Sequence, residues 1–485
     1  MFSELKKLFK HSGIYALGAI AQAGLSFLLV PFYTRFLSQA DYGRLEILQA
    51  FLKILLFLIP LGLPSAILKC YHRDAKSRDE RKVLTSTAFF FVLFSGILQT
   101  LILLFFLHPL SQFLLKTDLN LLLFLTIATA LFAASLELFL AFLRAEERSR
   151  FYTLIFLLRF ILTLGITIYL VVILQWGIAG ALIGNMFSQI LTLLFFLPYL
   201  KNYVRIKISW TALGRLLSFG IAILPASIAM WVMDLSDRYF LNHFSNLAEV
   251  GIYSLGYRVG FILEFCLVIP FQLAWPSFSF RIAKQQNHRQ IYARVLTYFF
   301  LAGILISLFL SLFAPEIVRI LAPSDYAAAA SIVPFVSLAY VFYGLHFVLA
   351  PGIHLSGKTK YYPLIIIFPA VLNIFLNYYL IPFYGMYGAA IATLISFTFL
   401  LFLAYFVSNH FYPVRYEWRR LAKICILGFG ILALFFFLPI DSILAKIGLL
   451  ILFFLALYGI RFWEKEEKKM IKKILRRKVY KFFDY

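Results

Sequence analysis

Residues 224–276 read LPASIAMWVMDLSDRYFLNHFSNLAEVGIYSLGYRVGFILEFCLVIPFQLAWP and determine how the rest of the chain is interpreted. The segment holds two apolar runs of membrane length, joined by a short polar turn. Its charged residues include Asp234, Asp237, Arg238, Arg258 and Glu264. A charge at bilayer depth costs about 2.5 kcal/mol or more, so each needs a partner, an aqueous cavity or a ligand. The segment therefore predicts a polar site between membrane helices.

The composition of the whole chain agrees with a membrane protein. Of its 485 residues, 62% are hydrophobic and 14% are charged, whereas soluble domains have about 25% charged residues. The net charge of +23 comes from basic residues scattered over many short loops, so no nucleic-acid partner is expected. The three cysteines are far apart and no HExxH motif occurs, so neither a metal site nor a cofactor is expected.

Apolar runs predict about 14 transmembrane helices in an all-α polytopic membrane protein. Most Lys and Arg residues then fall in alternate loops, which predicts that both termini are cytoplasmic. The basic tail has apolar residues near helical spacing and is expected to lie on anionic lipid headgroups. The predicted spans are 13–37, 44–68, 83–107, 119–143, 151–174, 178–200, 215–240, 249–273, 291–313, 328–350, 361–381, 386–408, 421–439 and 444–462.

An internal repeat predicts the architecture. The sequence ADYG at 40–43 recurs as AEVG at 248–251, and WGIAGA at 176–181 recurs as YGMYGA at 384–389. Both pairs have the same offset and six spans separate the copies, so the repeat is parallel and predicts two six-helix lobes. The predicted parts are an N-terminal lobe at 1–205, a C-terminal lobe at 206–412, an appended helix pair at 413–463 and a basic cytoplasmic tail at 464–485.

Cations at bilayer depth are the candidate substrate-binding residues. The repeat offset maps Arg258 onto Ala50, one turn from Lys53, so both lobes place a cation at similar depth. Two cations facing one cavity suit an anionic headgroup, and arginine matches the oxygen pairs of a diphosphate. Arg159 extends this path or pairs with Glu137. The alternative is that Arg258 and Lys53 form structural ion pairs.

The acidic residues of the same region are candidates for ion coupling or gating. Asp234 and Arg238 lie one helical turn apart and are expected to pair. Asp237 is a candidate for binding a coupling H⁺ or Na⁺, and Glu264 lies about 120° around the helix from Arg258, which makes it a poor partner within that helix.

A transporter that works by alternating access also needs helices that bend. Proline removes a backbone hydrogen bond and kinks a helix. Gly220 and Pro225, in the predicted span 215–240, are the candidate hinge.

Several stretches resemble the polysaccharide-biosynthesis flippases, the Wzx-like O-antigen branch of the multidrug/oligosaccharidyl-lipid/polysaccharide exporter superfamily. They are LVPFYTRFLS at 29–38, LRAEER at 143–148 and VGIYSLGYR at 250–258. The resemblance implies two lobes in a V shape that move undecaprenyl-diphosphate-linked glycan from the inner to the outer leaflet of the bacterial inner membrane. It also implies that membrane lipids and glycan polymerase machinery are candidate partners.

The same resemblance suggests site residues. Arg258 is similar to the arginine with which the related lipid II flippases meet the diphosphate in their eighth helix. Arg35 lies near their basic cluster in the first helix, but Val30 and Pro31 stand where a second charged pair is expected. This departure favours a Wzx-like flippase over a lipid II flippase.

Two other function classes are alternatives to a flippase. A cation-coupled drug antiporter of the same superfamily favours acidic residues deep in the cavity, whereas Lys53, Arg159 and Arg258 are cationic. A membrane glycan polymerase or ligase predicts a large outer loop or a clustered catalytic site, and the sequence shows neither. A transporter rather than an enzyme is therefore expected.

Overall fold

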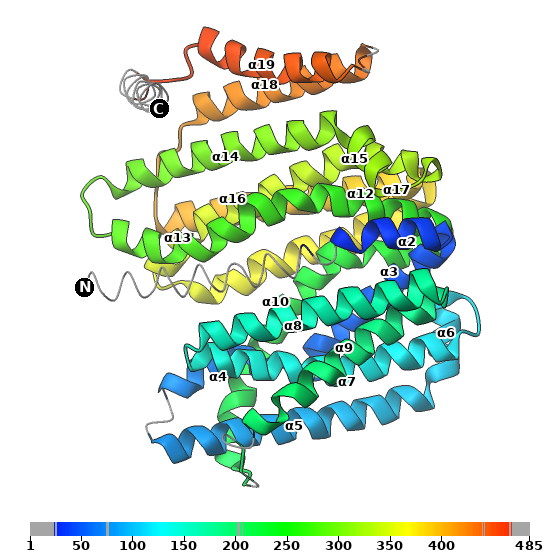
Figure 1. Ribbon diagram of the computed structural model, residues 1–485. Coiled ribbons are helices and arrows are strands. Elements are labelled where there is room, and N and C mark those ends of the chain that lie inside the picture. Colours follow the sequence, from blue (N-terminus) through cyan, green and yellow to red (C-terminus); the bar gives the residue numbers. More distant parts are fainter. Residues whose placement is uncertain are drawn as a thin grey trace, which may run out of the picture.

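The protein folds into two stacked helical bundles with a helix pair packed on the outside of the second (Figure 1). The computed structural model describes residues 24, 27–73, 77–200, 204–205, 207–438, 440, 442–464 and 467. Within these residues every regular element is a helix. The predicted fold class, an all-α polytopic membrane protein with two lobes and an appended pair, is confirmed.

In the described part of the N-terminal bundle, the short helix α2 has Pro31 as its second residue. Ser38 caps the next helix by accepting a hydrogen bond from the amide of Asp41, and Ser77 and Glu80 form a capping box at the start of α5. The elements are α2 (Val30–Phe36), α3 (Gln39–Leu58), α4 (Leu63–Arg73), α5 (Arg78–Phe105), α6 (Leu107–Leu115), α7 (Asn120–Ala145), α8 (Ser149–Ile168), η1 (Tyr169–Ile173) and α9 (Gly177–Leu200).

The C-terminal bundle follows the same pattern of long helices and short connections. Its first long helix, α10, contacts α3, α4 and α5 of the N-terminal bundle as well as α17. The elements are α10 (Trp210–Leu235), α11 (Asp237–Phe244), α12 (Leu247–Leu263), η2 (Glu264–Val268), α13 (Ile269–Ile282), α14 (His288–Leu312), α15 (Ala314–Leu321), η3 (Ser324–Ile332), α16 (Val333–Leu355), η4 (Thr359–Tyr361) and α17 (Tyr362–Phe411).

The predicted number of 14 spans is not confirmed. In the described part of the chain, 11 helices are long and apolar enough to cross a membrane. One of them, Thr359–Phe411, contains two predicted spans and breaks at Gly385, where φ is +52°. About half of the first predicted span, residues 13–23, 25 and 26, lies outside the described residues. The predicted connections 108–119 and 314–327 are partly helical, since α6 and α15 occupy them.

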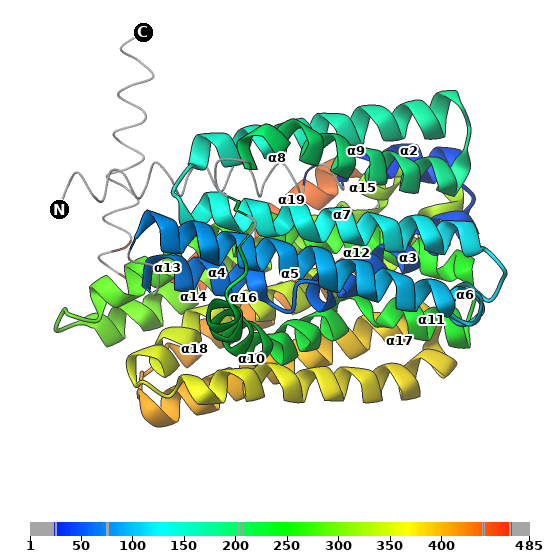
Figure 2. The ribbon, with the colours of Figure 1, turned by 90° about the horizontal axis from the view of Figure 1, so that it is seen from below.

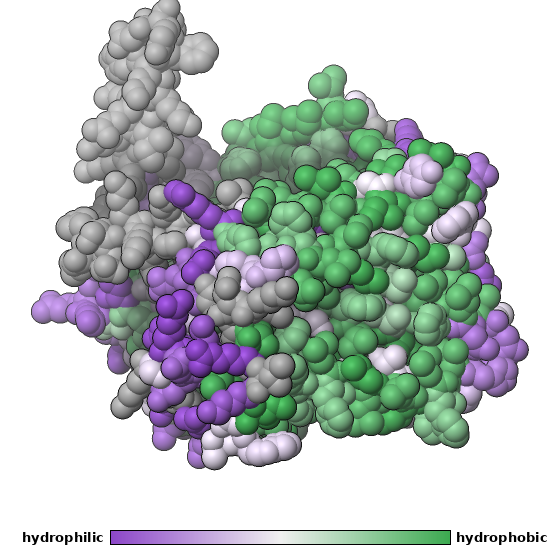
Figure 3. Space-filling view, turned by 60° about the horizontal axis from the view of Figure 1, so that its bottom comes forward, coloured by the Kyte–Doolittle hydropathy of each residue, from purple (hydrophilic) through white to green (hydrophobic). Residues whose placement is uncertain are grey.

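The surface divides into an apolar belt between two hydrophilic ends (Figure 3). Large apolar side chains are exposed on the long helices, among them Phe94, Phe195 and Phe402. Exposed apolar surface of this extent is stable where lipid covers it. We call one end of the bundle the basic end; it contains the connections α7–α8, α13–α14 and α17–α18. The opposite end contains α6, α11 and α15 (Figures 1 and 2).

The internal repeat appears in the backbone. Gly177 and Gly385 occupy equivalent repeat positions, and both have left-handed φ values, +57° and +52°. Such values favour glycine because other residues place a Cβ close to the backbone. In the second copy, the carboxylate of Glu249 accepts a hydrogen bond from the amide of Met386, 2.7 Å away, and so fixes the chain just after Gly385.

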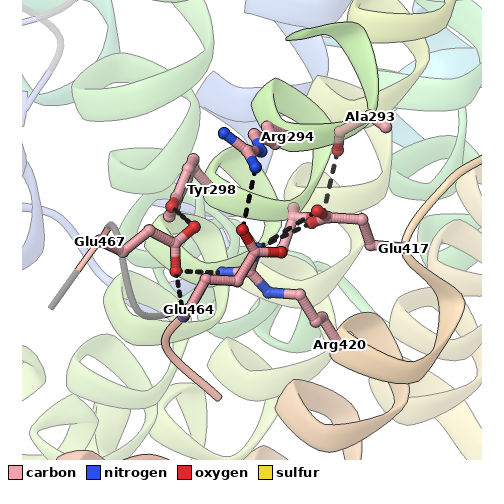
Figure 4. Close-up of polar contacts among 8 residues, drawn as sticks. Ala293, Arg294, Tyr298, Glu417, Arg420, Glu464 and Glu467 are labelled. Atoms are coloured by element: carbon pink, nitrogen blue, oxygen red, sulfur yellow. Dashed lines mark hydrogen bonds and ion pairs between the residues drawn. The ribbon is translucent and has the colours of Figure 1, made fainter. Parts of the chain in front are cut away.

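The appended helices α18 (Trp418–Phe437) and α19 (Ile443–Gly459) pack against α14. At the basic end, Arg420 of α18 pairs with Glu417 and Glu467, each 3.1 Å away, while Arg294 of α14 pairs with Glu464 at 2.9 Å (Figure 4). Lys446 of α19 is 2% exposed and pairs with Glu316 of α15 at 2.6 Å. Beyond Glu464 and Glu467, the predicted lipid-bound tail lies outside the described residues.

Candidate functional site

Glu46 and Arg258 join the two bundles by an ion pair. Helix α12 packs along α3, and the guanidinium of Arg258 on α12 bonds to the carboxylate of Glu46 on α3. The Nε of Arg238 lies 3.8 Å from the second oxygen of Glu46. The Glu46 side chain is 6% exposed, whereas that of Arg258 is 21% exposed. Arg258 is therefore the more accessible partner of the pair.

Arg238 anchors a second set of polar contacts at the start of α11. Its guanidinium pairs with Asp237 at 2.9 Å and lies 4.7 Å from the centre of the Tyr257 ring. The hydroxyl of Tyr253 donates to the other oxygen of Asp237. Both Asp237 and Arg238 are almost fully buried. These contacts connect the start of α11 to α12, so the buried pair stabilises the packing of these two helices.

The expected pairing of Asp234 with Arg238 is wrong in one respect. Arg238 donates to the main-chain carbonyl of Asp234, at 2.9 Å, and its side-chain partners are Asp237 and Glu46. The reason is geometric: α10 ends at Leu235 and α11 begins at Asp237, so the residues do not share one helix. The carboxylate of Asp234 interacts electrostatically with both Lys53 and Arg238, without a direct ion pair to Arg238.

A cavity of about 170 Å³ lies beside the Glu46–Arg258 pair. Arg159 of α8 also lines it and forms a 3.2 Å ion pair with Glu137 of α7. Of the two alternatives for Arg159, the structure shows the pair with Glu137, and its place on a cationic substrate path stays a prediction. The other lining residues are Leu29, Tyr33, Leu45, Gln49, Phe156, Phe160, Thr163 and Asn185.

The remaining predicted residues lie elsewhere. Lys53 does not line this cavity; its side chain is exposed and interacts electrostatically with Asp234 and Glu46. Arg35 lies at the opposite end, where it donates to the carbonyl of Ile320 at 2.9 Å and so links the bundles. Glu264 begins the π-helical segment η2 and is half-buried.

The two hinge candidates lie within α10. A Cβ at Gly220 would collide with the carbonyl oxygen of Leu61, in the turn before α4. Gly220 thus permits α10 to approach the N-terminal bundle closely. Pro225 lies one turn further along the same helix. Their role as a hinge stays a prediction.

Sequence reasoning missed Glu46, the carboxylate that pairs with Arg258. A usable signal exists, because Glu46 lies two helical turns before Lys53 and therefore on the same face of α3. With Glu46 and Asp237 included, the contact between the bundles contains carboxylates as well as cations. An anionic ligand must therefore compete with Glu46 for Arg258.

Among the described residues, no group of three or more His, Cys, Asp or Glu residues is placed to hold a metal ion. The site instead offers arginines, carboxylates and a partly open cavity. Arginine forks of this kind can bind paired anionic oxygens.

A family model described as "Polysaccharide biosynthesis protein" matches residues 8–280, more than half of the chain. The chain belongs to this family. A second model, MatE, matches residues 222–379. An uncharacterized membrane protein of Haemophilus influenzae is 25% identical over 266 residues. That match covers 53% of this chain and 61% of the relative, less than two-thirds of its length.

Two solved structures relate the family member to transporters by fold. The lipid II flippase MurJ, in an inward closed conformation, superposes with a TM-score of 0.73 at 16% identity, covering 92% of this chain and 98% of that one. An inward-facing multidrug resistance MATE transporter of the MOP superfamily gives a TM-score of 0.69 at 15% identity, covering 83% and 96%. The fold is therefore the one shared by MurJ and MATE transporters.

Proposed function

We propose that this protein is a flippase for undecaprenyl-diphosphate-linked oligosaccharide, such as O-antigen, capsule or exopolysaccharide repeat units. It moves them from the inner to the outer leaflet of the bacterial inner membrane by alternating access. Membership of the polysaccharide biosynthesis family and the fold shared with a lipid II flippase support this proposal. The observation that carries it is the cavity in which Arg258 and Arg159, from different bundles, lie together.

Arg258 is the proposed diphosphate-binding residue. Its side chain is partly exposed in the cavity, and a guanidinium can donate two parallel hydrogen bonds to paired phosphate oxygens. A diphosphate that takes this position replaces Glu46 as its partner. Because Glu46 lies on α3 and Arg258 on α12, this exchange weakens a bond between the bundles. Substrate binding is thereby coupled to their separation.

The other predicted residues have supporting roles in this proposal. Arg159 adds positive charge in the cavity and Lys53 adds it outside the cavity lining, while Arg35 stabilises the closed contact at the opposite end. Asp234, Asp237, Glu264, Glu137 and Arg238 are the candidates for ion coupling or gating. Gly220 and Pro225 are the proposed hinge, and the basic end is proposed to face the cytoplasm.

Binding of undecaprenyl-diphosphate lipid to the purified protein tests this function. Wild type is compared with Arg258→Ala and with a matched control, Arg319→Ala, which removes an exposed arginine from α15. We expect salt-sensitive binding that is lost in Arg258→Ala and kept in Arg319→Ala, because a charge-assisted contact disappears. Equal binding by all three proteins would remove Arg258 from the substrate path.

A cation-coupled drug antiporter is the second candidate. The MatE match and the carboxylates Glu46 and Asp237 near the bundle interface favour it. An organic cation would then bind in place of Arg258 at Glu46. Absence of lipid binding by wild type, together with binding of an organic cation that Glu46→Gln abolishes, would select the antiporter.

A further inference from the structure

A second cavity, of about 320 Å³, lies at the basic end of the N-terminal bundle. It is separate from the cavity at Arg258 and shares no lining residue with it. Four of its described lining residues are basic and one is acidic: Arg78, Arg81, Lys82 and Arg148, with Glu146. The described lining therefore has an excess of positive charge.

The start of α5 determines where three of these cations lie. The capping box of Ser77 and Glu80 fixes the first turn of the helix. Arg78, Arg81 and Lys82 then follow at helical spacings of three and four residues, which places them on one face. Arg148 comes from the connection between α7 and α8. The cations thus converge from two separate parts of the bundle.

Glu146 offsets only one of the four positive charges. One of its oxygens accepts a hydrogen bond from the hydroxyl of Tyr71 at 2.9 Å, and the other lies 3.0 Å from Arg148. Arg81 lies over the face of the Tyr71 ring, 5.1 Å from its centre. These contacts hold the pocket walls in place, while Arg78 is exposed and Lys82 is half-buried.

The chemistry of the pocket favours a phosphate group. Arginine and lysine donors that converge from several directions can bind several oxygens of one phosphate group. The pocket lies at the basic end, where α5 begins and α7 connects to α8. Basic pockets between helices on the cytoplasmic side of a membrane bind phosphate-containing lipid headgroups.

We propose that this pocket is a phosphate-binding site for an anionic ligand, distinct from the central cavity. A membrane lipid headgroup and a soluble phosphate compound share the chemistry that the site recognises. The proposal does not depend on the transport function, because it rests on the lining residues alone.

Titration of the purified full-length protein in detergent tests the site. The probes are inorganic diphosphate, dihexanoyl phosphatidylglycerol and, as the neutral counterpart, dihexanoyl phosphatidylcholine. The test variant is Arg78→Gln with Lys82→Gln, since both residues line the pocket and neither is fully buried. The matched control is Arg281→Gln with Lys284→Gln, which removes two exposed cations from the end of α13 and the connection after it, at the basic end of the C-terminal bundle. Any binding at Arg258 is common to both variants.

We expect wild type and control to bind an anionic probe with an affinity that falls as salt rises. The test variant should lose this salt-sensitive binding by roughly tenfold or more, because two charge-assisted contacts disappear. Binding of phosphatidylglycerol would identify a lipid headgroup, and binding of diphosphate alone would identify a soluble phosphate compound. Equal affinity of test and control variants, or equal binding of phosphatidylcholine, would overturn the proposal.

Discussion

Gly43 of α3 and Gly251 of α12 lie against each other's helix at the end opposite the basic end. A Cβ at Gly43 would collide with the carbonyl oxygen of Leu247, and a Cβ at Gly251 would collide with that of Gln39. The two glycines are equivalent residues of the internal repeat. The repeat motif is thus also the contact that brings the two bundles together, and Gln39 adds a 2.8 Å hydrogen bond to the carbonyl of Asp325.

Gly251→Ala should weaken this contact. The added methyl group has no space, and overpacking of this kind costs roughly 1–3 kcal/mol. The population should therefore shift toward conformations that are open at this end. Cysteines at positions 39 and 325, with Cys70, Cys266 and Cys425 replaced by serine, should cross-link less efficiently in the variant. Gly165→Ala, where a Cβ meets nothing within 4 Å, is the control and should cross-link like wild type.

The glycine contact shows how far sequence reasoning reaches. The repeat predicted two related lobes, because the spacing of its motifs can be read directly from the sequence. It did not predict that Gly43 meets Gly251, since packing between distant segments depends on the angle at which the bundles meet. Glu46 was missed for the same reason: its partner Arg258 is 212 residues away. The pair of Arg159 with Glu137, one of two alternatives that the sequence left open, joins the adjacent helices α7 and α8.

Glu46→Gln and Arg258→Gln should have opposite effects on lipid-diphosphate binding. Removing the charge of Glu46 frees the guanidinium for the substrate, so affinity should stay the same or rise. Removing the charge of Arg258 should lower affinity roughly tenfold or more, since a charge-assisted pair is worth about 1.5–3 kcal/mol. The measurement is equilibrium binding of undecaprenyl-diphosphate lipid to each purified variant. Similar losses in both would instead assign the pair a purely structural role.

Asp237→Ala should destabilise the fold. It leaves Arg238, which is 3% exposed, without its closest carboxylate. Removing one member of a buried ion pair typically costs about 3–5 kcal/mol. A lower thermal unfolding midpoint in detergent is therefore expected, whereas the exposed control Asp325→Ala should change it little. A variant that keeps its unfolding midpoint but loses transport would assign Asp237 to ion coupling.

The cluster around Arg420 should respond to acid. Burial opposes ionisation of Glu467, but hydrogen bonds from Tyr298 and the Glu464 amide, and the charge of Arg420, outweigh it and lower the pKa of Glu467. The ionised form therefore stabilises the fold fully above the ordinary pKa of 4.5, and this is lost as pH falls through the lowered pKa. The difference in unfolding midpoint between wild type and Glu467→Gln should be constant near pH 7 and vanish in strong acid. A difference in unfolding midpoint that persists in strong acid would show that the charge of Glu467 is not its cause.

Chemical labelling from outside the cell determines which end of the protein faces outward. Asn246, before α12, lies at the opposite end, and Gln286, between α13 and α14, lies at the basic end; both are exposed. Cytoplasmic loops of membrane proteins are enriched in Lys and Arg, so the basic end should face inward. In a background without native cysteines, Asn246→Cys should react with an impermeant thiol reagent in intact cells. Gln286→Cys should react only after the membrane is opened. The reverse pattern would place the basic end outside, and substrate would then enter the cavity from the wrong leaflet for the proposed flippase.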